Sequence, residues 1–176
     1  MSLGKEFLES VIKRAGYYKD LADKTFAQLT EADLHYQPNE ESNSIAINIQ
    51  HMAGNMLSRW TNFLSSDGEK DWRNRDQEFE EQRLSKDQLL AYWEKGWACF
   101  LGALNDLTEQ DLLRIIHIRS EELLVVDAIN RQLAHYPYHV GQIIYTGKII
   151  KNKSWINLSI PRGASATFTH NMQNKK

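Results

Sequence analysis

Two histidines of this chain are spaced so that they could bind one metal ion together. His135 and His139 lie four residues apart, and in an α-helix that spacing places two side chains on one face, with their Cβ atoms about 5–6 Å apart. Imidazole is a common ligand of zinc and of several other divalent metals. The pair alone is a weak indication, because two histidines at this spacing also occur by chance.

The surroundings of the pair favour a site over coincidence. The side chains that share its helical face are small or carry amides: Ala128, Gln132, Gln142 and Thr146. The adjacent face is apolar and is expected to lie in the protein core: Ile129, Leu133, Val140 and Ile144. Histidines beside a buried face need hydrogen-bond partners or a metal ion.

Pro137 lies between the two histidines, inside a segment whose periodicity predicts continuous helix. An interior proline removes a backbone hydrogen bond and costs on the order of 3 kcal/mol. Departures from local rules often fall at functional sites, although a harmless kink in a long helix is the competing explanation. The proline alone therefore does not separate the two interpretations.

His51 is the third candidate ligand, on a second predicted helix. At 100° per residue it lies off the centre of that helix's apolar stripe. Taken by itself, a solvated or core-edge histidine explains this position better than a ligand does. Three histidines with open coordination positions would suit Zn²⁺, Ni²⁺ or Fe²⁺ equally well on ligand chemistry.

Helical periodicity predicts the elements that must position these side chains. Apolar residues recur at spacings of three and four over residues 7–29, 44–65, 85–104 and 126–151. Ser44 is expected to cap the second helix, and Ser85 with Gln88 predicts a capping box at the start of the third. Four long amphipathic helices predict an all-α four-helix bundle, as a single domain over residues 1–176.

The connections between these helices are expected to differ in kind. Residues 67–84 are polar and charged, which predicts a long solvated connection between the second and third helices. Residues 112–124 contain a cluster of isoleucines followed by polar residues, which predicts a short β-hairpin or extended segment before the fourth helix. Residues 152–176 are predicted to form an irregular tail that lies across the bundle.

Composition and charge exclude several classes of protein. Of the 176 residues 41% are hydrophobic and 25% are charged, and the net charge of −2 comes with scattered lysines and arginines, so no nucleic-acid surface is predicted. No apolar run is long enough for a membrane span, and no signal peptide is recognised. The single cysteine, Cys99, excludes an internal disulfide and is interpreted as a small buried hydrophobe. We therefore expect a cytoplasmic protein.

The fourth-helix motif resembles that of a known family. Residues 135–142, HYPYHVGQ, match the H-x-x-x-H-x-G-Q signature of the DinB/YfiT-like superfamily of proposed metalloenzymes. Residues 128–135 and the tail 155–165 resemble one subfamily whose function is unknown. The resemblance implies a DinB-like bundle in an up-down-down-up arrangement, in which a long crossover joins the second and third helices. It also implies that His51, His135 and His139 hold one divalent metal.

The resemblance further implies candidate chemistry. Characterised relatives include thiol transferases that use low-molecular-weight thiols such as bacillithiol or mycothiol. A bound metal can lower the pKa of a thiol or of a water molecule, so thiol transfer and hydrolysis of a small-molecule substrate are both expectations. Zinc or nickel is expected first, with iron or manganese as further candidates. The resemblance makes a homodimer plausible, and the alternative is a non-catalytic, metal-stabilised binding or stress-response bundle.

Three further polar residues lie within one or two helical turns of the proposed ligands: Gln142, Asn55 and Arg131. Each is a candidate to contact a ligand histidine or to line the substrate pocket. Gln142 is the strongest of the three because it belongs to the motif. Ordinary polar packing is an equal explanation for Asn55 and Arg131.

Overall fold

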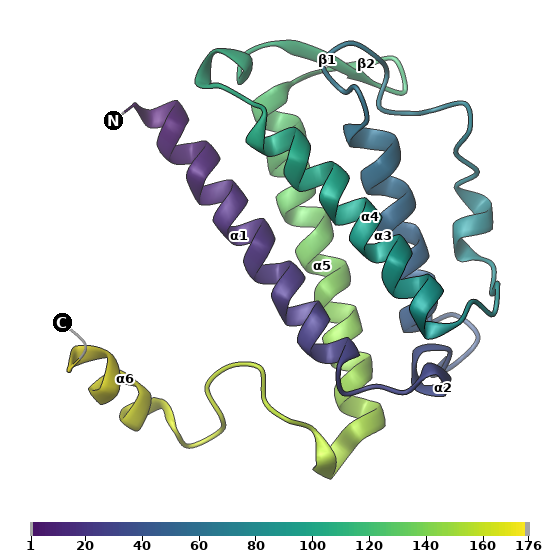
Figure 1. The fold of residues 1–176 in the computed structure, drawn as a ribbon, viewed down its shortest axis with the longest axis vertical. Helices are drawn as coiled ribbons and strands as arrows, with labels where there is room; N and C mark the ends of the chain where they lie inside the picture. The colour runs from purple at the N-terminus through teal and green to yellow at the C-terminus, as the bar shows by residue number, and fades with distance from the viewer. Residues whose placement is uncertain (1, 175–176) are drawn as a thin grey trace.

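Four long helices form a bundle in the computed structural model, which describes residues 2–174 (Figure 1). They are α1 (Leu3–Phe26), α3 (Ile45–Trp60), α4 (Lys86–Asn105) and α5 (Val125–Lys151). The shorter elements are α2 (Glu31–Leu34), η1 (Asp76–Phe79), η2 (Glu109–Asp111), β1 (Ile115–Ile118), β2 (Glu121–Leu124), η3 (Asn152–Ser154) and α6 (Ser165–Gln173). The predicted all-α bundle is confirmed. No helix within residues 2–174 combines the length and hydropathy of a membrane span.

Helices α3 and α4 run in the same direction, and α1 and α5 run opposite to them (Figure 1). The parallel pair packs closely, since a Cβ added to Gly96 would lie 2.8 Å from the Cα of Ala53. One turn further along both helices, the Cys99 sulfur lies 3.9 Å from the Met56 carbonyl oxygen. This is the predicted up-down-down-up arrangement, in which the segment between α3 and α4 must return along the whole bundle.

Capping side chains set the helix starts, as the sequence predicts. The Ser44 hydroxyl accepts a hydrogen bond from the Ile47 amide at 3.1 Å, and Ser85 forms the capping box with Gln88. The predicted end of the second helix, near residue 65, is wrong. Helix α3 ends at Trp60, and Asn62 then adopts a left-handed backbone conformation with φ of 50°. Because such a turn breaks the helical hydrogen-bond ladder, Phe63 reaches the core from a turn instead of from the helix.

Large aromatic side chains fill the space between the helices. Trp93, Trp97 and Phe100 of α4 are each about 1% exposed, and so is Tyr136 of α5. The Tyr136 hydroxyl accepts a hydrogen bond from the indole nitrogen of Trp60 at 3.1 Å. Because Tyr136 directly follows His135, this buried contact fixes the register in which α5 presents its histidines to α3.

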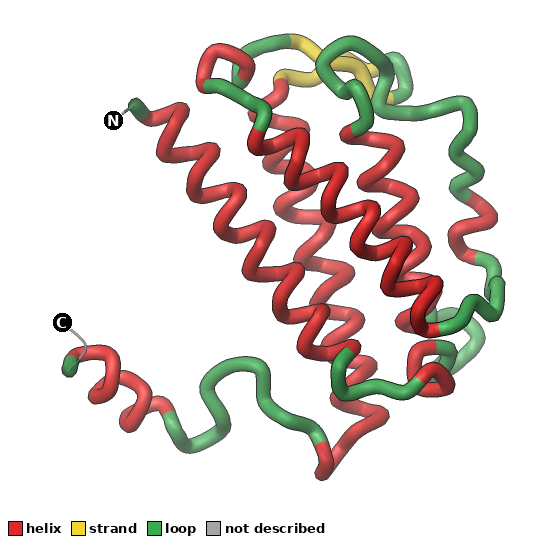
Figure 2. Tube along the Cα trace, in the orientation of Figure 1, coloured by secondary structure: helices red, strands yellow, loops and turns green. Residues whose placement is uncertain are grey.

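The predicted hairpin is present at one end of the bundle, where β1 pairs antiparallel with β2 (Figure 2). Its turn is tied to the start of the crossover. The Asp67 carboxylate accepts hydrogen bonds from the backbone amides of Arg119 at 2.8 Å and Ser120 at 2.7 Å. The Gly68 amide in turn donates to the His117 carbonyl oxygen at 2.8 Å. The crossover therefore leaves α3 along a defined path.

The tail differs from its prediction in two respects. Residues 165–173 form α6, so the tail is not irregular throughout, and α6 lies away from the four long helices instead of across them (Figure 1). Its first residues are anchored, since the Ile156 amide donates to the Gln28 side chain at 2.8 Å. None of the residues in α6 is buried, so packing on the bundle contributes nothing to its position.

Candidate metal centre

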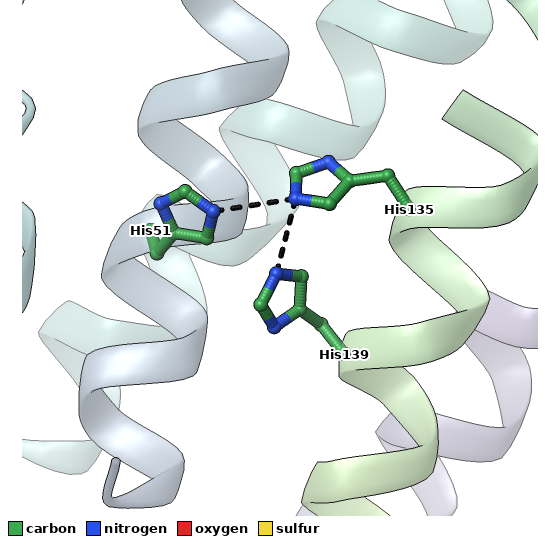
Figure 3. A group of neighbouring side chains, drawn as sticks. All are labelled: His51, His135 and His139. Atoms are coloured by element: carbon green, nitrogen blue, oxygen red, sulfur yellow. Dashed lines mark hydrogen bonds between the residues drawn. The ribbon is translucent and has the colours of Figure 1, made fainter. Parts of the chain in front are cut away.

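The imidazoles of His51 from α3 and of His135 and His139 from α5 point toward one another (Figure 3). The Nε2 atom of His135 lies 3.4 Å from that of His51 and 3.0 Å from that of His139. One ligand atom from each of the three side chains falls within 4.8 Å of the others. Two nitrogens bound to one tetrahedral zinc ion at about 2.0–2.1 Å lie roughly 3.3 Å apart. The spacing therefore fits a single ion.

The Nδ1 atom of each of the three rings faces a side-chain oxygen. The Nδ1-to-oxygen distances are 3.0 Å for His51–Glu78, 3.4 Å for His135–Gln132, 2.8 Å for His139–Gln142 and 3.1 Å for His139–Asn48. An oxygen acceptor at Nδ1 assigns the proton to that nitrogen and leaves a lone pair on Nε2. Three lone pairs then converge with no proton between them, an arrangement that a cation would stabilise. The donor set therefore fits a divalent metal.

Burial keeps the imidazoles of His135 and His139 neutral. His51 is 5% exposed and His139 is 7% exposed, while His135 is half-buried. Burial and the neighbouring histidines lower the pKa of His135 to about 3. Burial and His51 lower the pKa of His139 to about 4. Near neutral pH both rings are therefore in the unprotonated form that binds metal ions, without a proton to displace.

Glu78 reaches the site from the crossover, and sequence reasoning missed it. The predicted solvated loop is exposed over most of its length, but Glu78 of η1 is only 7% exposed. Burial raises the pKa of Glu78, but hydrogen bonds from His51 and Arg73 outweigh it and hold the pKa below its usual value. The side chain therefore faces His51 as a carboxylate.

Gly54 makes the approach of Glu78 possible. A Cβ added at this position, three residues after His51 on α3, would lie 2.2 Å from Oε1 of Glu78. Any larger residue would exclude the carboxylate from its place beside His51. Nothing in the local sequence marked this glycine or Glu78, since both depend on a contact between segments distant along the chain.

The other candidate residues have separate positions. Gln142 contacts the ring of His139, as described above. The Asn55 amide oxygen accepts a hydrogen bond from the Tyr136 hydroxyl at 3.1 Å, so Asn55 braces α5 against α3. Arg131 is exposed, and its charge helps to lower the pKa of His135. Asn48 was not among the predicted residues, although its place one turn before His51 could have indicated it.

Comparisons with known proteins identify a family and a shared fold. A family model described as "Protein of unknown function (DUF1572)" matches residues 2–164. The fold is similar to a crystal structure of a conserved protein from Enterococcus faecalis, with a TM-score of 0.62 and 17% sequence identity. That similarity covers 85% of this chain and 98% of the other, and at this identity it shows a shared fold alone. No curated protein matches the chain.

Proposed function

The chain belongs to the family of unknown function DUF1572, which has the DinB-like fold, and from that premise we propose that it is a metal-dependent enzyme acting on a small molecule. The observation that carries the proposal is the convergence of three imidazole Nε2 lone pairs, each ring being held at Nδ1 by an oxygen acceptor. His51, His135 and His139 would hold one divalent ion. We propose zinc or nickel first, with iron or manganese as alternatives.

Three protein ligands leave coordination positions for a substrate. A divalent ion held there would supply Lewis-acid activation of a thiol or of a water molecule. We therefore propose two reaction classes, transfer of a low-molecular-weight thiol and hydrolysis. The ligand rings would be oriented by Glu78, Gln132 and Gln142, which contact their Nδ1 atoms. Because His135 is the half-buried ligand, its side of the site is where a substrate would enter.

A non-catalytic role has one observation in its favour. The site joins α3 to α5 inside the bundle, and two of its three ligands are at most 7% exposed. A metal there would crosslink two helices and stabilise the fold. The two roles differ in whether an added thiol can reach the ion. Binding of a small thiol to the Co²⁺-loaded protein would change its visible absorption spectrum in the enzyme and leave it unchanged in a closed structural site.

A homodimer is proposed on the resemblance together with one surface feature. Helix α5 exposes Tyr138, Tyr145 and Ile149, which are 61%, 68% and 47% exposed and lie on one side of the helix. Light scattering of the full chain tests this proposal. A monomeric mass at micromolar concentration would refute it.

Metal analysis of protein purified without a histidine tag tests metal binding itself. We expect close to one equivalent of metal in the wild type and loss of it in His135→Ala and in His139→Ala. His117→Ala is the matched control, because His117 lies in the hairpin with its side chain 49% exposed. If wild type and the two ligand variants bind equally little metal after reconstitution, the proposal fails.

A further inference from the structure

Two oppositely charged side chains are buried in the otherwise exposed crossover. The side chains of Arg73 and Glu78 are 2% and 8% exposed. They form a two-pronged ion pair, with Arg73 Nε 2.7 Å from Oε1 and Nη2 2.8 Å from Oε2 of Glu78. A buried ion pair seldom stabilises a fold more than apolar residues of the same size would. The pair therefore calls for an explanation other than stability.

The contact of Glu78 with His51 supplies that explanation. The Oε2 atom of Glu78 accepts the Nδ1 proton of His51 at 3.0 Å. The acceptors for His135 and His139 are amides, so His51 is the one ligand whose acceptor carries a charge. A charge-assisted hydrogen bond is stronger than a neutral one, and it makes the opposite ring nitrogen a better electron donor to a metal.

The same short helix holds the His51 ring in a second way. Phe79, the neighbour of Glu78 in η1, packs against the imidazole with ring centroids 4.7 Å apart. On its other side the carboxylate is confined by Gly54 and by the Arg73 guanidinium, as the close approach to Gly54 shows. The ring of His51 therefore has one orientation, which the crossover imposes.

We propose that Glu78, clamped by Arg73, is a positioning residue that sets the metal affinity of the site through His51. The proposal rests on the proposed metal binding. It makes the crossover a working part of the metal centre, although none of its residues is a ligand. Arg73 fixes where the carboxylate lies, and Glu78 fixes the tautomer and the donor strength of His51.

A cavity beside the ion pair makes this proposal testable by chemical rescue. It has a volume of about 240 Å³, and its wall includes Gln50, Gly54, Arg73 and Glu78. Arg73 Nη1 has no hydrogen-bond partner among residues 2–174 and lies 3.8 Å from the nearest carboxylate oxygen of Glu69. Removal of the Glu78 side chain would open the cavity toward His51. A small carboxylate could then occupy that space, bound to Arg73.

The experiment compares Zn²⁺ affinity, measured by chelator competition, in wild type, Glu78→Ala and Asp76→Ala. We expect Glu78→Ala to bind zinc about 10–100-fold more weakly and formate or acetate to restore affinity in a saturable way. Asp76→Ala is the matched control, because Asp76 is an acidic residue of the same short helix whose side chain is 97% exposed. Its zinc affinity should stay at the wild-type value, with no gain from formate.

The Nδ1 proton of His51, followed by NMR of the zinc-loaded protein, gives a readout that a merely structural role would not move. Its resonance should shift upfield in Glu78→Ala and return with formate. If Glu78→Ala does not fold, Glu78→Gln keeps the shape and the acceptor but loses the charge, and it should bind zinc more weakly than wild type.

The outcomes separate the two proposals. Absence of zinc binding in the wild type would refute metal binding itself. Wild-type binding together with unchanged affinity in Glu78→Ala, or in Glu78→Gln where only that variant folds, would overturn the role of Glu78. A loss in Glu78→Ala that neither formate nor acetate reverses, with no change at the His51 proton, would also overturn it.

Discussion

Replacement of Gly54 by alanine perturbs the contact between Glu78 and His51 without a mutation of either residue. In the middle of a helix this change is usually stabilising by about 1 kcal/mol, because alanine loses less conformational freedom on folding. On α3 the added Cβ would lie 2.2 Å from Oε1 and 2.8 Å from Cδ of Glu78. We therefore expect the sign of the effect to reverse.

The magnitude follows from what holds Glu78 in place. Ordinary contact begins near 3.4 Å, so Oε1 would have to move by about 1.2 Å. A glutamate end usually swings aside at little cost, but this one is bonded to Arg73 and to His51. A hydrogen bond to a charged group contributes about 1.5–3 kcal/mol. Loss of one such bond outweighs the gain in helix propensity, and we expect a net destabilisation of about 1–2 kcal/mol.

Urea denaturation of the metal-free protein and chelator competition for Zn²⁺ measure the two effects. Gly16→Ala is the matched control, because Gly16 lies inside α1 with nothing within 4 Å of an added Cβ. It should be stabilising by roughly 0.5–1 kcal/mol and leave zinc affinity unchanged. Gly54→Ala should weaken zinc binding, because His51 loses its acceptor.

A double-mutant cycle isolates the clash with Glu78. In a Glu78→Ala background the Gly54→Ala change no longer meets the carboxylate, so it should become stabilising like Gly16→Ala. If Gly54→Ala is already stabilising in the wild type and zinc affinity does not change, the Glu78 carboxylate does not lie against Gly54 and His51. The crossover would then have no part in placing the His51 ring.

Three further expectations concern other parts of the molecule. Gln142→Ala removes the 2.8 Å acceptor of His139 and should weaken zinc binding less than Glu78→Ala does, because an amide carries no charge and Asn48 remains as an acceptor; chelator competition gives the ratio. The metal-free protein should lose stability as pH falls below about 6.5, the pKa of a histidine in the unfolded chain. The unfolded chain then binds protons at both histidines, whereas the folded-state pKa values of about 3 for His135 and about 4 for His139 keep both rings unprotonated in the folded protein. The slope is up to about 1.4 kcal/mol per pH unit for each ring, and constant stability between pH 7 and 5 in urea titrations would contradict it. Gly96→Ala places a Cβ 2.8 Å from the backbone of α3 and should cost about 1–3 kcal/mol in urea denaturation, since two helices must separate.

Most helices could be predicted from the sequence because their causes are local. The serine caps at Ser44 and Ser85 and the 3.6-residue apolar period act between neighbours along the chain, and both are visible in the sequence. The incorrect predictions concern places where packing decides. The apolar Phe63 extended the predicted second helix, yet it reaches the core from a turn. The tail was expected on the bundle, but its residues in α6 bury nothing there.

The candidate site divides in the same way. The spacing of His135 and His139 is a property of one helix, so the sequence alone determined that these two rings share a face. The place of His51 came from the resemblance, because its position on the helical wheel favoured a solvated or core-edge histidine over a ligand. Its contact with Glu78 joins residues 27 positions apart and requires a parallel α3–α4 pair, a returning crossover and the space left by Gly54. Only the tertiary structure decides such a contact, because no local pattern distinguishes a charge that will be buried from one that will stay in water.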